Sequence, residues 1–164
     1  MREELVNLIA KKLLSLGGEL AGPASESEVI QVERRLAATL PIELKNFLRQ
    51  HNGSSKETDE GLWRFWSCAE ISSHADYRGV PFFDLNEIEK DLIQMVGRLP
   101  GERLILFSDA MIDLPTYGVF LLPGHPCDGW VFDSGYGYVS ARSFTEWVTA
   151  FTDHGEEGLL LPSG

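Results

Sequence analysis

Residues 25–53 read SESEVIQVERRLAATLPIELKNFLRQHNG and contain the signals that decide the fold. Ser25 and Glu28 have the spacing of a capping box, in which each side chain accepts a hydrogen bond from the backbone of the other residue. Apolar residues then recur at helical spacing, which is typical of a helix with one buried face; they are Val29, Val32, Leu36 and Leu40. The stretch therefore predicts a helix that begins after Ser25 and is broken at Leu40–Pro41.

A further helix is predicted directly after this break. Pro41 suits the first turn of a helix, and Thr39 or Leu40 precedes it as the candidate cap. Leu44, Phe47 and Leu48 form its predicted buried face. Gly53 is a natural left-handed end. Glu33 is predicted to accept a hydrogen bond from a backbone N–H group near Leu40–Pro41, and an ordinary solvated helix residue is the alternative.

The flanking sequence predicts a single α+β domain. Residues 3–16 have helical spacing, and residues 19–24 form a connector. The elements predicted downstream are a strand over 62–66, an irregular segment over 72–83, a helix from Asp84 or Asn86 to Val96, strands over 104–107, 117–122, 130–132 and 136–139, and a last helix over 144–151 opened by a capping box at Ser143–Glu146. Trp147 is predicted to fill the space between that helix and the sheet.

Because the later strands follow one another rather than alternate with helices, we predict a mainly antiparallel sheet flanked by helices. The single domain spans residues 1–164. Residues 1–24 form its N-terminal helix and connector, residues 25–151 its core and residues 152–164 a tail.

Length and composition exclude several classes of protein. The chain has 164 residues, of which 43% are hydrophobic, and a chain of this size needs no metal or disulfide to fold. No apolar run approaches the ~18 residues of a transmembrane helix, and the N-terminus lacks the pattern of a secretory signal. Two cysteines, Cys68 and Cys127, fit a reducing compartment. We therefore expect a cytoplasmic protein without a cofactor.

The charge is strongly negative and unevenly distributed. The net charge is −11, and residues 61–164 carry 6 basic and 15 acidic side chains, or −9. Such a field repels nucleic acid and anionic membranes, and it attracts basic proteins. Acidity that merely aids solubility is the alternative. The charge predicts a basic protein partner and leaves the oligomeric state open.

We find no strong catalytic or metal-binding motif. The histidines lie outside HExxH patterns, and His125-Pro126-Cys127-Asp128 matches no zinc spacing. Four aspartates lie at predicted strand ends or turns, where carboxylates can bind Ca²⁺, but aspartate also favours turns because its side chain bonds nearby backbone N–H groups; they are Asp109, Asp113, Asp128 and Asp133. The sequence thus predicts no catalytic residue and no metal ligand.

Aromatic and acidic residues near the strands are the candidates for contact with a protein partner. Most of the aromatic residues are expected in the core, but tyrosine and tryptophan are typical interface anchors where they are exposed. The predicted partner-binding residues are Trp63, Asp109, Asp113, Asp133, Tyr136 and Tyr138.

The order of these motifs resembles the SUKH superfamily, which includes the Smi/Knr-type domain of fungal cell-wall regulators and many bacterial immunity proteins. Residues 33–41 read Glu-x-x-Leu-Ala-x-x-Leu-Pro, where the family usually has Glu-x-x-Leu-Gly-x-x-Leu-Pro. Residues 104–109, 117–121 and 141–148 are similar to two later strands and the closing helix of the family. The resemblance covers about residues 25–151. Its structural motif residues are Glu33, Leu36, Leu40, Pro41, Phe47, Gly53, Phe144 and Trp147.

The resemblance implies binding rather than catalysis. Bacterial members are typically cytoplasmic immunity proteins that bind and block a cognate toxin of a polymorphic or contact-dependent system. Many of these toxins are nucleases with basic clefts, which an acidic protein can cover. A scaffold domain of the cell-wall-regulator type is the second hypothesis. The third is a metal-dependent hydrolase that would use Asp109, Asp113, His125 and Asp128.

Overall fold

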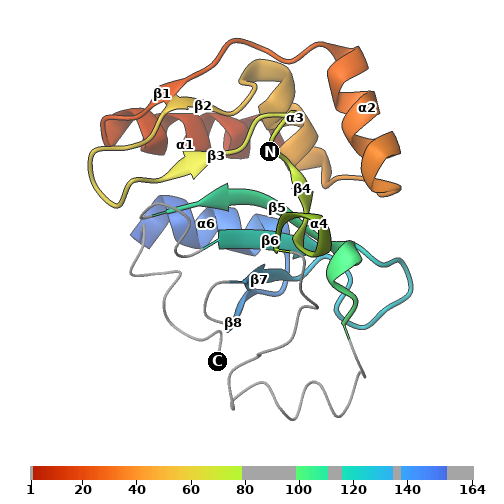
Figure 1. Ribbon diagram of the computed structural model, residues 1–164. Helices are drawn as coiled ribbons and strands as arrows, with labels where there is room; N and C mark the ends of the chain where they lie inside the picture. Colours follow the sequence, from red (N-terminus) through yellow and green to blue (C-terminus); the bar gives the residue numbers. More distant parts are fainter. Residues whose placement is uncertain (1, 79–98, 111–115, 135–137, 155–164) are drawn as a thin grey trace.

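A computed structural model of the chain describes residues 2–78, 99–110, 116–134 and 138–154 (Figure 1). Its upper part in Figure 1 contains three helices and a two-stranded ribbon, namely α1 (Arg2–Ser15), β1 (Glu19–Leu20), α2 (Glu26–Leu36), α3 (Ile42–Gln50) and β2 (Ser54–Lys56). Its lower part is an antiparallel sheet with α6 (Phe144–His154) behind it. The predicted α+β class is therefore confirmed.

The main sheet has the strand order β3-β5-β6-β7-β8, and β4 also pairs with β5. Its strands are β3 (Arg64–Phe65), β4 (Ser72–Ser73), β5 (Leu104–Asp109), β6 (Thr116–Phe120), β7 (Val131–Asp133) and β8 (Tyr138–Ala141). All pairings among the described strands are antiparallel. Every residue of β5 is buried, as is typical of a strand that is formed by a continuous apolar run and covered on both faces. The short helices α4 (His74–Arg78) and η2 (Gly101–Arg103) contact each other beside β4.

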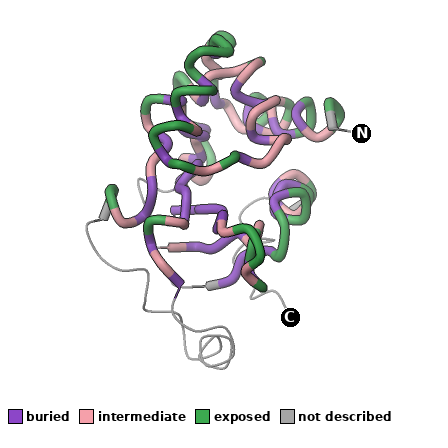
Figure 2. Tube along the Cα trace, turned by 90° about the vertical axis from the view of Figure 1, so that its right-hand side faces the viewer, coloured by how far each residue is buried: buried purple, intermediate pink, exposed green. Residues whose placement is uncertain are grey.

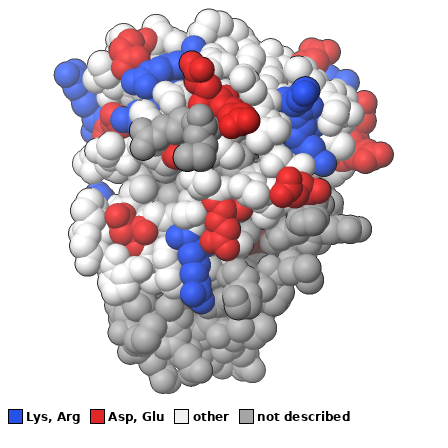
Figure 3. Space-filling view, turned by 180° about the vertical axis from the view of Figure 1, so that it is seen from behind, with Lys and Arg blue, Asp and Glu red and all other residues white. Residues whose placement is uncertain are grey.

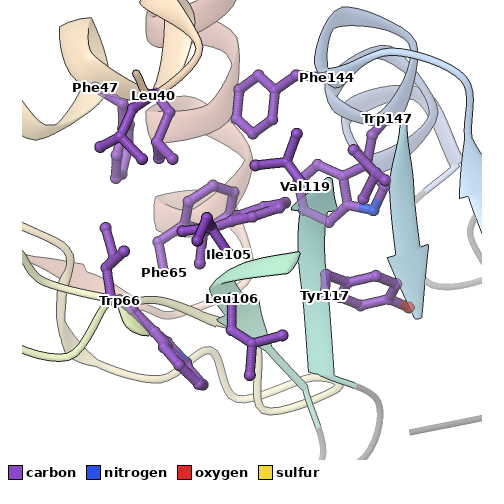
Figure 4. Close-up of a cluster of buried hydrophobic side chains, with 14 of the residues drawn as sticks. Leu40, Phe47, Phe65, Trp66, Ile105, Leu106, Tyr117, Val119, Phe144 and Trp147 are labelled. Carbon is purple, nitrogen blue, oxygen red and sulfur yellow. The ribbon is translucent and has the colours of Figure 1, made fainter. Parts of the chain in front are cut away.

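Trp147 joins the last helix to the sheet, as predicted. Its side chain is fully buried, and its ring centroid lies 5.0 Å from that of Phe107 on β5 and 5.3 Å from that of Tyr117 on β6 (Figure 4). Phe65 continues the cluster, since its ring lies 5.8 Å from that of Trp147 and 5.0 Å from that of Phe47 on α3. One apolar core thus connects the helical part to the sheet, and Figure 2 shows buried positions on both.

The stretch that decides the fold forms a helix–corner–helix unit. The capping box is confirmed: the Glu28 N–H donates to Ser25 Oγ, and the Ser25 N–H donates to the Glu28 carboxylate. The cap of the next helix differs from the prediction, because Pro41 itself is the N-cap of α3, with φ −53° and ψ 140°. Leu40, predicted as a possible cap, instead buries its side chain in the core.

Some elements were missed by the sequence prediction. Strand β1 lies in the predicted connector over residues 19–24 and pairs with β2, for which no strand was predicted. Helix α4 lies in the segment predicted as irregular. Strands of two or three residues are too short to show an alternating apolar pattern. The helix predicted from Asp84 or Asn86 to Val96 lies outside the described residues.

Candidate protein-interaction surface

The structure contradicts the predicted exposure of three partner-contact residues. Trp63, Asp109 and Asp133 are each at most 2% exposed. Asp113 and Tyr136 lie outside the described residues, and Tyr138 begins β8 with its side chain also outside them. Trp63 is buried because its indole stacks on Tyr117 with ring centroids 5.5 Å apart. A partner cannot reach these three side chains without opening the core.

Asp109 belongs to a buried polar network at the end of β5. Its Oδ2 accepts hydrogen bonds from Arg64 Nε at 2.9 Å and from the indole Nε1 of Trp66 at 2.5 Å. The same guanidinium donates through Nη1 to Glu70 at 2.5 Å. Glu70 in turn accepts from the backbone N–H of Ser67 at 3.1 Å. The network therefore fixes β3 and the turn after it against β5.

The charges of this network stabilise one another. Burial disfavours the charged form of Arg64, but its hydrogen bond with Glu70 and the nearby Asp109 carboxylate outweigh that cost and raise the pKa of Arg64. Burial likewise opposes ionisation of Glu70, yet the hydrogen bond from Arg64 lowers the pKa of Glu70 below its usual value. Both groups are thus held in their charged forms. This is the chemistry of a structural ion-pair network.

The Glu33 prediction is confirmed at the corner between α2 and α3. Glu33 Oε1 accepts a hydrogen bond from the Leu40 N–H at 3.0 Å and lies 3.2 Å from Lys45 Nζ on α3. Ala37, between them, ends α2 in the left-handed conformation with φ 50°. The corner is therefore held by one carboxylate that bonds both to the turn and to the next helix.

An open groove of about 630 Å³ lies beside this corner. One side is formed by the end of α2 and the residues after it, and the other by the loop between β6 and β7, both on the right in Figure 1. Ile30, Leu121 and Pro123 contribute apolar surface, and Arg34 and Arg103 contribute guanidinium groups. Arg103 donates from Nε to the Leu121 carbonyl at 2.7 Å and from Nη1 to the Ala37 carbonyl at 3.1 Å.

Neither arginine was predicted as a site residue. The bonds of Arg103 reach residues 18 and 66 positions away in the chain, so no local pattern reveals them. Arg34 directly follows Glu33 of the corner motif, and this neighbouring position is the sequence feature that could have marked it as a candidate.

The face of the molecule seen in Figure 3 is not uniformly acidic. Figure 3 shows acidic side chains interspersed with basic ones over the helical part of the molecule. Two acids of the second half of the chain, Asp109 and Asp133, are buried and add nothing to the exposed acidic surface. Any electrostatic attraction of a partner must therefore come from other carboxylates.

The histidine–cysteine turn serves a local structural role in the described residues. His125 Nδ1 accepts a hydrogen bond from the Cys127 N–H at 3.0 Å, and Asp128 Oδ1 accepts one from the Leu122 N–H at 2.9 Å.

No group of three or more His, Cys, Asp or Glu side chains that could hold a metal ion occurs within the described ranges. Burial raises the pKa of the Cys68 thiol. Within the same ranges, no helix is long and apolar enough to span a membrane.

Comparison with known proteins decides the family. The model of the SMI1 / KNR4 family (SUKH-1) matches residues 23–150, which is most of the chain. The chain belongs to the SUKH family. No curated protein matches it closely enough to suggest a more specific relative. In this SUKH domain, the matched region contains the corner, the groove and the whole main sheet.

The SUKH pattern explains the strain at Ala37. The family usually has glycine at this position, and the left-handed conformation costs an L-residue about 1–2 kcal/mol relative to glycine. Glycine also gives the unfolded chain more conformational freedom than alanine does, and this offsets part of the stabilisation. Ala37→Gly is therefore expected to raise the free energy of unfolding by about 0.5–1 kcal/mol, measured by urea denaturation.

The neighbouring Ala38→Gly is the matched control. Ala38 does not have a positive φ, so glycine there has no strain to relieve and is expected to destabilise by about 0.5–1 kcal/mol. Equal losses in the two variants would contradict this account of the corner.

Proposed function

We propose that this SUKH domain is a cytoplasmic immunity protein, which neutralises a cognate bacterial toxin by binding over its active surface without catalysis. The family match over residues 23–150 is the observation that carries the proposal. The net charge of −11 supports a basic partner domain, such as that of a nuclease toxin. A scaffold domain of the cell-wall-regulator type is the second candidate, and the same family match supports it.

The buried positions of Asp109 and Asp133 change how the electrostatic part of this proposal is tested. Reversing either charge would disturb the core, so lost binding would not report on the interface. The salt dependence of binding needs no substitution. Between about 0.05 M and 0.5 M salt, exposed charge pairs become strongly screened, and we expect the dissociation constant to rise. A constant affinity over this range would contradict recognition by exposed acids.

Capture of the tagged full chain from its native cells tests the proposal itself. We expect one stoichiometric partner with a basic C-terminal domain, identified by mass spectrometry. Expression of that domain alone is then expected to arrest growth, and co-expression of this chain to restore it. A basic partner that is harmless when expressed alone, or recovery of several cell-envelope proteins, would favour the scaffold function instead.

A further inference from the structure

The groove beside the α2–α3 corner contains two guanidinium groups with unequal surroundings. Arg103 is held rigidly by the Leu121 and Ala37 carbonyls, through Nε and Nη1. Arg34 is exposed, and its guanidinium has no hydrogen-bond or ion-pair partner within the part of the chain that the structure describes. Arginine favours planar anions because its fork of donors matches a carboxylate. The pair thus offers one fixed and one adjustable donor group to a ligand.

The acidic side chains of the groove are already engaged. Glu33 accepts the bond from the Leu40 N–H and pairs with Lys45 at 3.2 Å. Asp128 accepts from the Leu122 N–H at 2.9 Å. These carboxylates are occupied by the protein's own donors, whereas Arg34 is not. Lys45 compensates the charge of Glu33, whereas Asp128 keeps its charge because its partner is a neutral N–H group. Arg34 and Arg103 therefore face one uncompensated carboxylate, which leaves a local excess of one positive charge, although the whole chain carries −11.

Screening by salt determines whether a ligand in the groove is affected mainly by the charges that line it or by the negative charge of the whole chain. At physiological ionic strength the screening length is about 8 Å. Exposed acids outside the groove are screened over this length, so the charges that line the groove decide the potential there. Among those charges, Arg34 and Arg103 outnumber the uncompensated Asp128.

We propose that this groove binds an aspartate or glutamate side chain of a partner protein, with a neighbouring aliphatic side chain of the partner packed on Ile30, Leu121 and Pro123. Arg34 and Arg103 receive the carboxylate. The volume of about 630 Å³ lies within the range of ~300–1,000 Å³ that is usual for ligand sites, and Ile30 is 39% exposed although it is large and apolar. This inference goes beyond the proposed immunity function. The groove would bind the same kind of side chain if the protein were a scaffold domain.

Peptide selection on the purified full chain tests the proposal. Random peptides displayed on phage are selected against the immobilised protein, and the best binder is synthesised with its acidic residue and with the matching amide. We expect the selected sequences to share an acidic residue beside an aliphatic one. Replacement of that acid by its amide is expected to weaken binding about tenfold, as is typical for a charge-assisted hydrogen bond.

Variants of the protein locate the contact. R34Q is expected to weaken binding of the peptide about tenfold with unchanged thermal stability, because Arg34 supports no other described residue. R103K keeps the charge but loses the fork, and a smaller loss is expected. K11Q removes the same charge from an exposed position of α1 and is expected to bind as the wild type does.

Three results would overturn the proposal. The first is a selection that yields no acidic consensus. The second is a peptide that binds R34Q and R103K as tightly as the wild type. The third is an affinity for glutarate equal to the affinity for the peptide. This would indicate a site for small dicarboxylates rather than for a protein segment.

Discussion

Asp109→Ala is expected to lower the free energy of unfolding by about 3 kcal/mol. Removing one partner of a buried ion pair typically costs about 3–5 kcal/mol, because the other charge remains without compensation. The lower end applies here, since the Arg64 side chain is 32% exposed and keeps Glu70 as a partner. The indole N–H of Trp66 also loses its acceptor in this variant.

Equilibrium unfolding in urea measures this loss, and Asp153→Ala is its control. Asp153 is an exposed residue of α6, so its removal is expected to change stability by less than about 0.5 kcal/mol. Asp109→Asn keeps an acceptor for Trp66 and is expected to lie between the two. If Asp109→Ala were as stable as Asp153→Ala, the network would not hold β3 on β5.

Asp109 also shows why the exposure of three candidate contact residues was predicted wrongly. A sequence shows that an acid follows an apolar run, and such an acid is usually exposed in a turn. The structure buries it because Arg64, which is 45 positions away, lies beside it across an antiparallel pair. Trp63 is buried for a similar reason, since its stacking partner Tyr117 comes from a distant strand. These burials depend on tertiary pairing, which local patterns do not encode.

The parts that were predicted correctly depend on short-range chemistry. Ser25 and Glu28 bond across three residues, and Glu33 reaches Leu40 across seven. Trp147 was placed correctly because an aromatic residue on the apolar face of a terminal helix has the sheet as its main partner. The groove was missed, since Arg103 and Leu121 come together only when β5 pairs with β6, and the groove forms where they lie beside α2.

Gly53 lies where the chain after α3 passes close to β3 and the residues that follow it. Its φ is 78°, and a Cβ atom there would lie 2.6 Å from the Ser67 nitrogen and 2.9 Å from the Phe65 carbonyl oxygen. Both atoms are backbone and cannot rotate away. The Gly53 carbonyl also accepts from the Ala21 N–H at 3.0 Å. The chain after α3 therefore passes so close to the segment after β3 that a side chain has no room.

Gly53→Ala is expected to lower the free energy of unfolding by about 3 kcal/mol or more, because left-handed strain of about 1–2 kcal/mol adds to overpacking of about 1–3 kcal/mol. Gly124→Ala separates the two contributions. Gly124 has nearly the same φ, 83°, but a Cβ atom there would have no neighbour within 4 Å, so this variant is expected to lose only the strain of about 1–2 kcal/mol. Urea unfolding of both variants gives the cost of the close approach as their difference. Equal losses would mean that the backbone at Ser67 yields, and that the SUKH glycine is required for its conformation alone.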